Sequence, residues 1–213
     1  MAGLERQDES ARMRARGIFC LEGEWDRDLR CDASVQPVLD LLSRCNNPQV
    51  PYIRRDIATK PEFEYYLKKW CQRMYETHPI LYLGFHGDPG KLYLGDRATW
   101  VDLDWLEERL EGRCKGRIIH FGSCGTVAIG VARLKRFLLA TQAQALCGYR
   151  LDVDWMAAAA FETILLRSLQ RFSVTRSGML AVQRQLRRDV SGLIRDLSFR
   201  MIIQPSRHRG GVG

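Results

Sequence analysis

Two short apolar runs in the middle of the chain each end at a side chain that could take part in nucleophilic catalysis. The first run, 80–85, ends at His86-Gly87, and the second, 118–123, ends at Cys124-Gly125. A cysteine attacks as its thiolate, but a free thiol has a pKa of about 8.5 and is mostly protonated at neutral pH. A neighbouring imidazole can take that proton and later give it to a leaving amine. The pattern therefore predicts Cys124 as nucleophile and His86 as its base.

The glycine after the histidine adds a second element to this hypothesis. Gly87 allows the backbone to approach a substrate carbonyl, and its N–H could form an oxyanion hole with the N–H of Cys124. We expect a helix over 126–141, beginning directly behind Cys124. The positive end of such a helix would favour both the thiolate and the oxyanion.

A sheet has to bring these side chains together. Both apolar runs are short, rich in β-formers and bounded by glycine, which indicates buried parallel strands. In an open α/β sheet, functional residues collect outside the carboxyl ends of the strands. His86 and Cys124 could therefore face each other at one sheet edge, and the residues between them suffice for a small hairpin and one crossover helix.

The rest of the chain alternates in the same way. Strands are predicted at 17–21, 50–53, 79–85, 117–121, 145–149 and 199–203, with a short edge strand at 91–95. Helices are predicted from Ser34, from Thr59 to 74, from Asp102 to 112, over 126–141, from Asp152 or Asp154 to 169, and over 178–197. We expect one α/β domain over 17–204, with a mostly parallel sheet of about six strands and helices on both faces, flanked by flexible segments at 1–16 and 205–213.

The order apolar strand, His-Gly, apolar strand, Ser-Cys resembles the signature of the caspase-like (clan CD) cysteine peptidases. Residues 145–155, followed by an Ala-rich helix, look like the corresponding segment of CHAT-domain proteins in that group. The resemblance implies a three-layer sandwich, peptide-bond cleavage, a dyad at His86 and Cys124, and an oxyanion donor at Gly87. The long processing linker of many caspases is absent here, so maturation into two chains is not implied.

In this fold the loop after the fifth strand builds the first specificity pocket. Here it carries Asp152 and Asp154, with Trp155 as a wall. A carboxylate at the pocket base would select Arg or Lys through a charge-assisted contact. Alternatively, one Asp caps the following helix. A preference for acidic residues would require a cation, for which Arg150 is the candidate.

Composition limits the other classes of function. The net charge is +8, but no nucleic-acid-binding motif accompanies it, so specific nucleic-acid binding is not expected. No apolar run reaches the roughly 20 residues that span a bilayer, and the first 16 residues lack the apolar stretch of a signal peptide. We expect a cytoplasmic protein without membrane partner, cofactor or metal.

A zinc site of His86, His120 and Cys124 is a weaker alternative, because it lacks a tight ligand spacing.

The leading hypothesis is a cysteine endopeptidase that cleaves protein substrates. By family analogy it would be a regulated effector in bacterial defence or cell death, activated by a partner or a small-molecule signal. The first alternative is a non-catalytic caspase-fold module whose basic surface binds a protein, a nucleotide signal or a nucleic acid. The second alternative is a thiol hydrolase or acyltransferase that acts on a small molecule.

Overall fold

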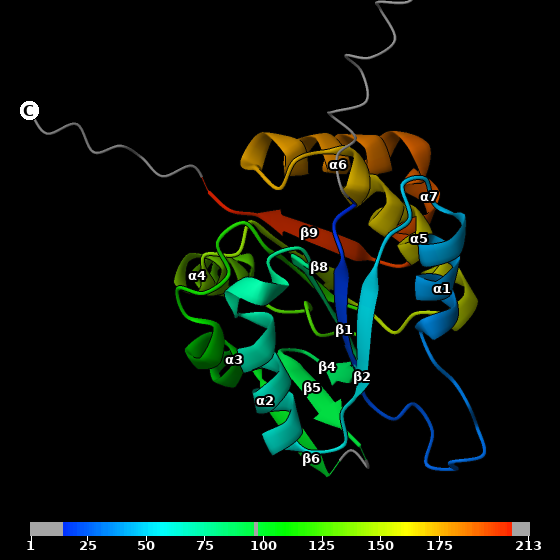
Figure 1. The fold of residues 1–213 in the computed structure, drawn as a ribbon, viewed down its shortest axis with the longest axis vertical. Coiled ribbons are helices and arrows are strands. Elements are labelled where there is room, and N and C mark those ends of the chain that lie inside the picture. Colours follow the sequence, from blue (N-terminus) through cyan, green and yellow to red (C-terminus); the bar gives the residue numbers. More distant parts are fainter. Residues whose placement is uncertain (1–14, 96–97, 206–213) are drawn as a thin grey trace, which may run out of the picture.

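The computed structural model describes residues 15–95 and 98–205, and a six-stranded sheet forms its centre (Figure 1). The strand order is β2 (Tyr52–Asp56), β1 (Ile18–Glu22), β3 (Ile80–Gly84), β7 (Ile118–Phe121), β8 (Ala145–Tyr149) and β9 (Phe199–Ile203). The first five strands are parallel, and β9 pairs with β8 in the antiparallel direction. The predicted mostly parallel sheet of about six strands is confirmed.

Two apolar layers lie on opposite faces of this sheet, because successive strand residues point to opposite sides. One layer takes Leu81 and Leu83 of β3 and packs against α2 (Lys60–Trp70), α3 (Leu103–Leu110) and α4 (Val131–Thr141). The other takes Ile80 and Tyr82 and packs against α1 (Gln36–Cys45), α5 (Trp155–Arg171) and α6 (Arg176–Asp189). The three-layer sandwich is thus confirmed.

Side-chain caps fix three of the helix starts where the sequence indicated them. Thr59 and Glu62 form a reciprocal capping box at α2. The carboxylates of Asp102 and Asp154 accept hydrogen bonds from the N–H groups of Trp105 and Ala157, each at 2.8 Å. Ser34, however, does not occupy the N-cap position of α1, which belongs to Val35. Instead the Ser34 hydroxyl donates to Glu22 at 2.9 Å.

The helix predicted over 126–141 begins only at Val131, so its early start was wrong. Gly125 adopts a left-handed φ of 65°, and its N–H is bonded to the Leu151 carbonyl at 3.3 Å. The Val127 N–H is likewise bonded to Tyr149 at the end of β8. The segment behind Cys124 is therefore anchored to the neighbouring strand and cannot supply the helix dipole that we expected there.

Three further elements differ from the sequence interpretation. The helix expected over 178–197 is divided at Val190 into α6 and α7 (Ser191–Asp196), and η1 (Arg73–Tyr75) follows α2 where one continuous helix was expected. The expected edge strand at 91–95 is the central strand β5 (Lys91–Leu94) of a separate antiparallel sheet. Its partners are β4 (His86–Asp88) and β6 (Thr99–Asp102). His86 therefore begins β4, two residues beyond the end of β3.

The two segments expected to be flexible, 1–16 and 205–213, lie largely outside the described residues. Arg16, just before β1, is bonded to α5: its backbone N–H donates to the Gln170 side chain at 2.8 Å and its guanidinium to the Leu169 carbonyl at 3.1 Å. Within the described part of the chain, no helix has both the length and the apolar character of a bilayer-spanning segment.

Candidate active site

Gly87 and Cys124 come into direct backbone contact beyond the carboxyl ends of β3 and β7. A Cβ atom on Gly87 would lie 2.6 Å from the Cys124 carbonyl oxygen and 2.3 Å from the Thr126 hydroxyl. The contact is reinforced on both sides, since the Gly90 N–H donates to the Thr126 carbonyl at 3.0 Å and the Thr126 hydroxyl donates to Lys91 at 3.1 Å. The two predicted active-site segments are thus joined, and only a glycine fits at position 87.

A backbone carbonyl orients His86. The Nε2 atom of His86 lies 2.8 Å from the carbonyl oxygen of Trp25, and the two rings meet edge-on with centroids 5.3 Å apart. A carbonyl can only accept, so Nε2 carries the proton of this bond. The unprotonated nitrogen of the neutral ring is therefore Nδ1.

The loop that carries Trp25 is held by a buried carboxylate at the end of β1. Glu22 is 1% exposed and accepts hydrogen bonds from the Trp25 indole at 2.6 Å and the Val35 N–H at 2.7 Å. Arg54 completes the arrangement with an ion pair at 2.5 Å. A buried acid with this many donors is satisfied as a charge. Glu22 therefore positions the carbonyl that orients His86.

Cys124 is half-buried, and its surroundings keep the sulfur protonated. Burial raises the pKa of the Cys124 thiol; the backbone N–H of Val153 lowers it, and the charge of Asp152 raises it again. The net direction is upward. At neutral pH this thiol therefore needs a base to become a nucleophile.

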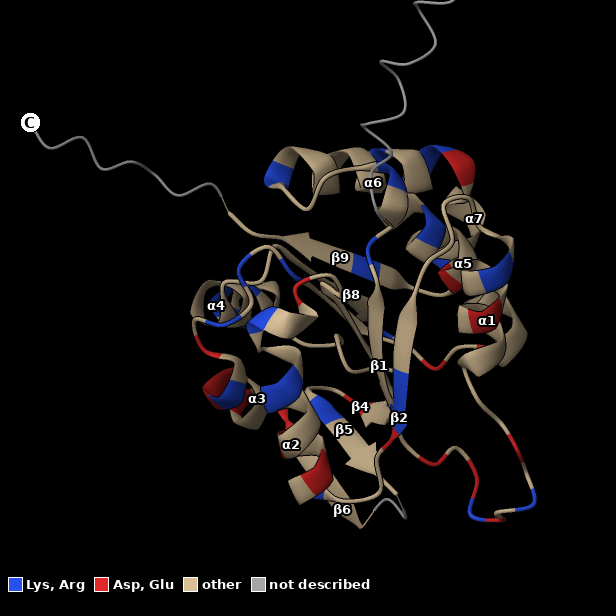
Figure 2. Ribbon diagram, in the orientation of Figure 1, with Lys and Arg blue, Asp and Glu red and all other residues tan. Residues whose placement is uncertain are grey.

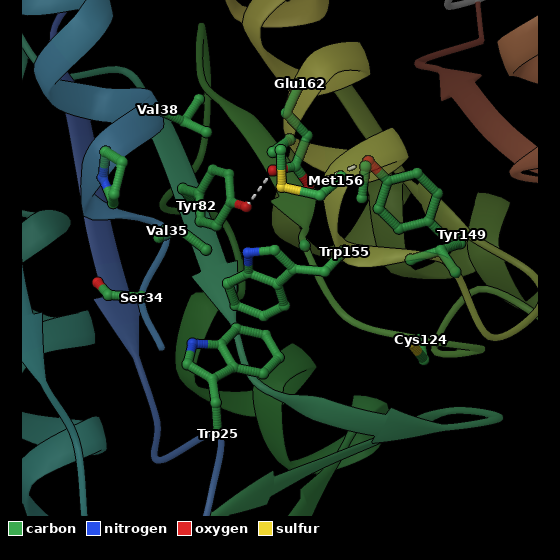
Figure 3. A pocket seen from close by; sticks show the side chains of 15 residues that line it. Trp25, Ser34, Val35, Val38, Tyr82, Cys124, Tyr149, Trp155, Met156 and Glu162 are labelled. Carbon is green, nitrogen blue, oxygen red and sulfur yellow. Dashed lines mark hydrogen bonds between the residues drawn. The ribbon is translucent and has the colours of Figure 1, made fainter. Parts of the chain in front are cut away.

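The three residues predicted to bind substrate occupy different environments. Asp154 caps α5, so its carboxylate is used structurally. Asp152 is exposed on the loop beside Cys124. Trp155 meets Trp25 edge-on with centroids 4.8 Å apart, and both indoles line a cavity (Figure 3). Trp155 thus lies beside the site as a wall, while neither aspartate is part of the cavity lining.

The cavity has a volume of about 260 Å³ and lies between α1, α5 and the carboxyl ends of the central strands, with Cys124 at one edge (Figure 3). Its lining is mostly apolar. Tyr82 fits closely against β7 because residue 122 is glycine: a Cβ atom there would lie 2.6 Å from the Tyr82 hydroxyl. Tyr82 and Glu162 provide polar atoms of the lining.

A hydrogen-bonded cluster of buried side chains stands behind the cavity. Glu162 accepts from the Tyr82 hydroxyl at 2.5 Å, from the Tyr149 hydroxyl at 3.0 Å and from His120 Nε2 at 3.1 Å. His120 Nδ1 lies 3.4 Å from the sulfur of Cys147. Burial and the Glu162 charge raise the pKa of both tyrosines, so their hydroxyls remain donors. His120 is thus a buried core histidine.

This cluster should make the free energy of unfolding decrease as the pH becomes alkaline. Burial lowers the pKa of His120, but Cys147 and Glu162 outweigh it and raise the pKa to about 10. An unfolded histidine has a pKa of about 6.5, so the stabilisation is complete below that pH and is lost as the pH rises through 10. We expect the urea midpoint of the protein to fall between pH 7 and 10, and this fall to be absent in His120→Gln. His78→Gln is the control, and equal slopes in all three proteins would contradict the assignment.

The alternative zinc site of His86, His120 and Cys124 is not assembled. His120 is committed to Glu162, and among the described residues no three or more His, Cys, Asp or Glu side chains gather as metal ligands would.

Sequence reasoning missed two parts of this site. The carbonyl of Trp25 carries no residue-type signal. Glu162 did carry one, because it falls on the buried stripe of α5 with Ala158, Phe161, Leu165 and Leu166 at helical spacing. A lone acid on an apolar helix face predicts a buried polar partner.

Comparison with known proteins agrees with the architecture. A family model described as "Family of unknown function (DUF6642)" matches residues 15–203. A search of curated proteins gives no match. Among solved structures, the crystal structure of Caspase-1 from Spodoptera frugiperda is similar, with a TM-score of 0.51 and 12% identity over 91% of this chain and 88% of that chain. At this identity the similarity shows the fold alone, which is caspase-like.

Proposed function

Because this chain belongs to DUF6642, a family of unknown function, its activity has to be argued from its own residues, and we propose that it is a cysteine endopeptidase. The observation that carries the proposal is the contact between Gly87 and Cys124, which brings the segment after β3 against the segment after β7. The hydrogen bond from His86 Nε2 to Trp25 supports it, since it places the proton of the neutral ring on Nε2 and makes Nδ1 the basic nitrogen.

The proposed reaction follows from these atoms. The sulfur of Cys124 bonds to the substrate carbonyl carbon while its proton moves to His86 Nδ1. The C–N bond then breaks, the leaving amine takes that proton, and a thioester remains. Water adds to the thioester as Nδ1 accepts its proton, and the S–C bond breaks with return of the proton to the thiol. The N–H groups of Gly87 and Cys124 are the proposed oxyanion donors.

Selective labelling tests this assignment. A peptidyl chloromethyl ketone alkylates a thiol with loss of chloride, and a peptide-binding site accelerates the reaction at its own cysteine. The exposed Cys31 and Cys45 serve as internal references. With each rate normalised to iodoacetamide, we expect Cys124 to react at least about 10-fold faster than either reference. Mass spectrometry reads the sites, and equal normalised rates would remove the proposal.

The residue preferred before the cut and the cellular role of the protein remain predictions. A preference for a basic residue now depends on the exposed Asp152, because Asp154 caps α5. A role as a regulated effector in bacterial defence or cell death rests on family analogy.

The non-catalytic binding module is the second candidate, and one observation favours it. Several arginine positions colour the ribbon of α6 and α7 blue (Figure 2), and Arg184, Arg187, Arg188 and Arg195 are exposed there. Arg188 and Arg195 are paired with adjacent aspartates, which reduces the field of this surface. Uniformly low thiol reactivity in the labelling experiment would favour this module.

A further inference from the structure

We propose that the cavity beside Cys124 receives a large apolar side chain, such as leucine, methionine or phenylalanine, from the substrate residue whose carbonyl is attacked. This inference rests on the proposed peptidase function and names its substrate class. Cys124 belongs to the cavity lining, so a residue bonded to its sulfur through the carbonyl carbon can place its side chain there.

The walls of the cavity are apolar on three sides. Trp25 and Trp155 form one side, Val38 of α1 another, and Met156 with Ala159 of α5 a third (Figure 3). Moving an apolar side chain from water into such surroundings favours binding. No Lys or Arg is among the described residues of the lining, so an acidic side chain would find no partner.

The one carboxylate in that lining, Glu162, is already used. Each of its oxygens accepts at least one hydrogen bond, from Tyr82, Tyr149 or His120. His120 is 0% exposed and forms an ion pair with Glu162 at 3.1 Å. A guanidinium or ammonium entering the cavity would therefore meet a carboxylate whose charge His120 already balances from behind, and it would lose its hydration. A basic side chain is disfavoured for this reason.

The size of the cavity fits one side chain. Sites for drug-sized ligands usually measure about 300–1,000 Å³, whereas this cavity measures about 260 Å³. It suits a single buried residue of a peptide better than a whole cofactor or nucleotide.

A peptide series that varies only the residue before the cut tests the inference by two readouts. One is hydrolysis by the wild-type protein, and the other is equilibrium binding to Cys124→Ala, which needs no catalysis. We expect peptides with leucine, methionine or phenylalanine to exceed those with arginine or aspartate by about 10-fold or more in both readouts. Ala159→Phe fills the cavity and should remove this advantage. Ala160→Phe, one position along on the exposed side of α5, should retain it.

The outcomes separate the inference from the proposed function. Stronger binding of the arginine peptide, lost in Asp152→Asn, would overturn the inference in favour of the exposed aspartate. Equal effects of Ala159→Phe and Ala160→Phe would overturn it as well. Apolar selectivity in binding without any hydrolysis would uphold the cavity assignment and remove the peptidase, and absence of both binding and hydrolysis would remove both.

Discussion

His86→Ala is expected to lower kcat for peptide hydrolysis by about 10²–10⁴-fold, because proton transfer by a positioned base contributes that much. The effect should be large here since the pKa of Cys124 is raised, chiefly by burial, and little thiolate forms unaided at neutral pH. The residual activity of the variant should therefore rise as the pH increases toward the thiol pKa. Initial rates from pH 6 to 10, set against the inactive Cys124→Ala protein, measure this directly.

The matched control is His78→Ala. His78 lies half-buried near the amino end of β3, where its ring packs on Gly17, away from Cys124. We expect this variant to keep the activity of the wild type, and thermal melts to show that both variants are folded. An unchanged kcat in His86→Ala at neutral pH would exclude the imidazole as the base. A parallel loss in His78→Ala would attribute the effect to folding instead.

Much of the architecture could be predicted because it depends on local patterns. The four inner strands of the central sheet, β1, β3, β7 and β8, are short, largely apolar runs, and the caps at Thr59, Asp102 and Asp154 are side chains with a known preference for helix starts. The segment after Cys124 resisted prediction for the opposite reason. Its backbone N–H groups bond to Leu151 and Tyr149, which are distant in sequence, and these contacts override a helical pattern that begins locally at Thr126.

The candidate site, too, could be predicted only in part. His86 and Cys124 were visible because their side-chain types are rare and reactive. The carbonyl of Trp25 was not, since every residue has one and only the folded chain selects it. The small sheet of β4, β5 and β6 was also not predicted as a unit. Its strands pair only because the chain leaves the central sheet after β3. That departure carries Gly87, the residue after His86, against the loop of Cys124.

Gly87→Ala should be the most damaging substitution that leaves both reactive side chains in place. The added Cβ would lie 2.3 Å from the Thr126 hydroxyl and 2.6 Å from the Cys124 carbonyl, so β4 and the Cys124 loop have to separate. Displacing reacting groups by about 1 Å can cost roughly 10²-fold in rate. Overpacking of this kind also costs about 1–3 kcal/mol of stability. We therefore expect at least a 10²-fold loss of kcat/KM together with a lower melting temperature.

Gly130→Ala is the matched control, on the connection between β7 and α4 that carries Cys124. Gly130 has a φ of −58°, and a Cβ atom there would meet nothing within 4 Å. Alanine should therefore be tolerated, with stability changed by less than about 1 kcal/mol, because the gain through the unfolded state is opposed by the poorer N-cap that alanine gives α4. If Gly87→Ala retained full activity, β4 and Cys124 could separate without consequence, and their contact could not be what assembles the site. If it lost stability but kept its rate, the contact would serve folding alone.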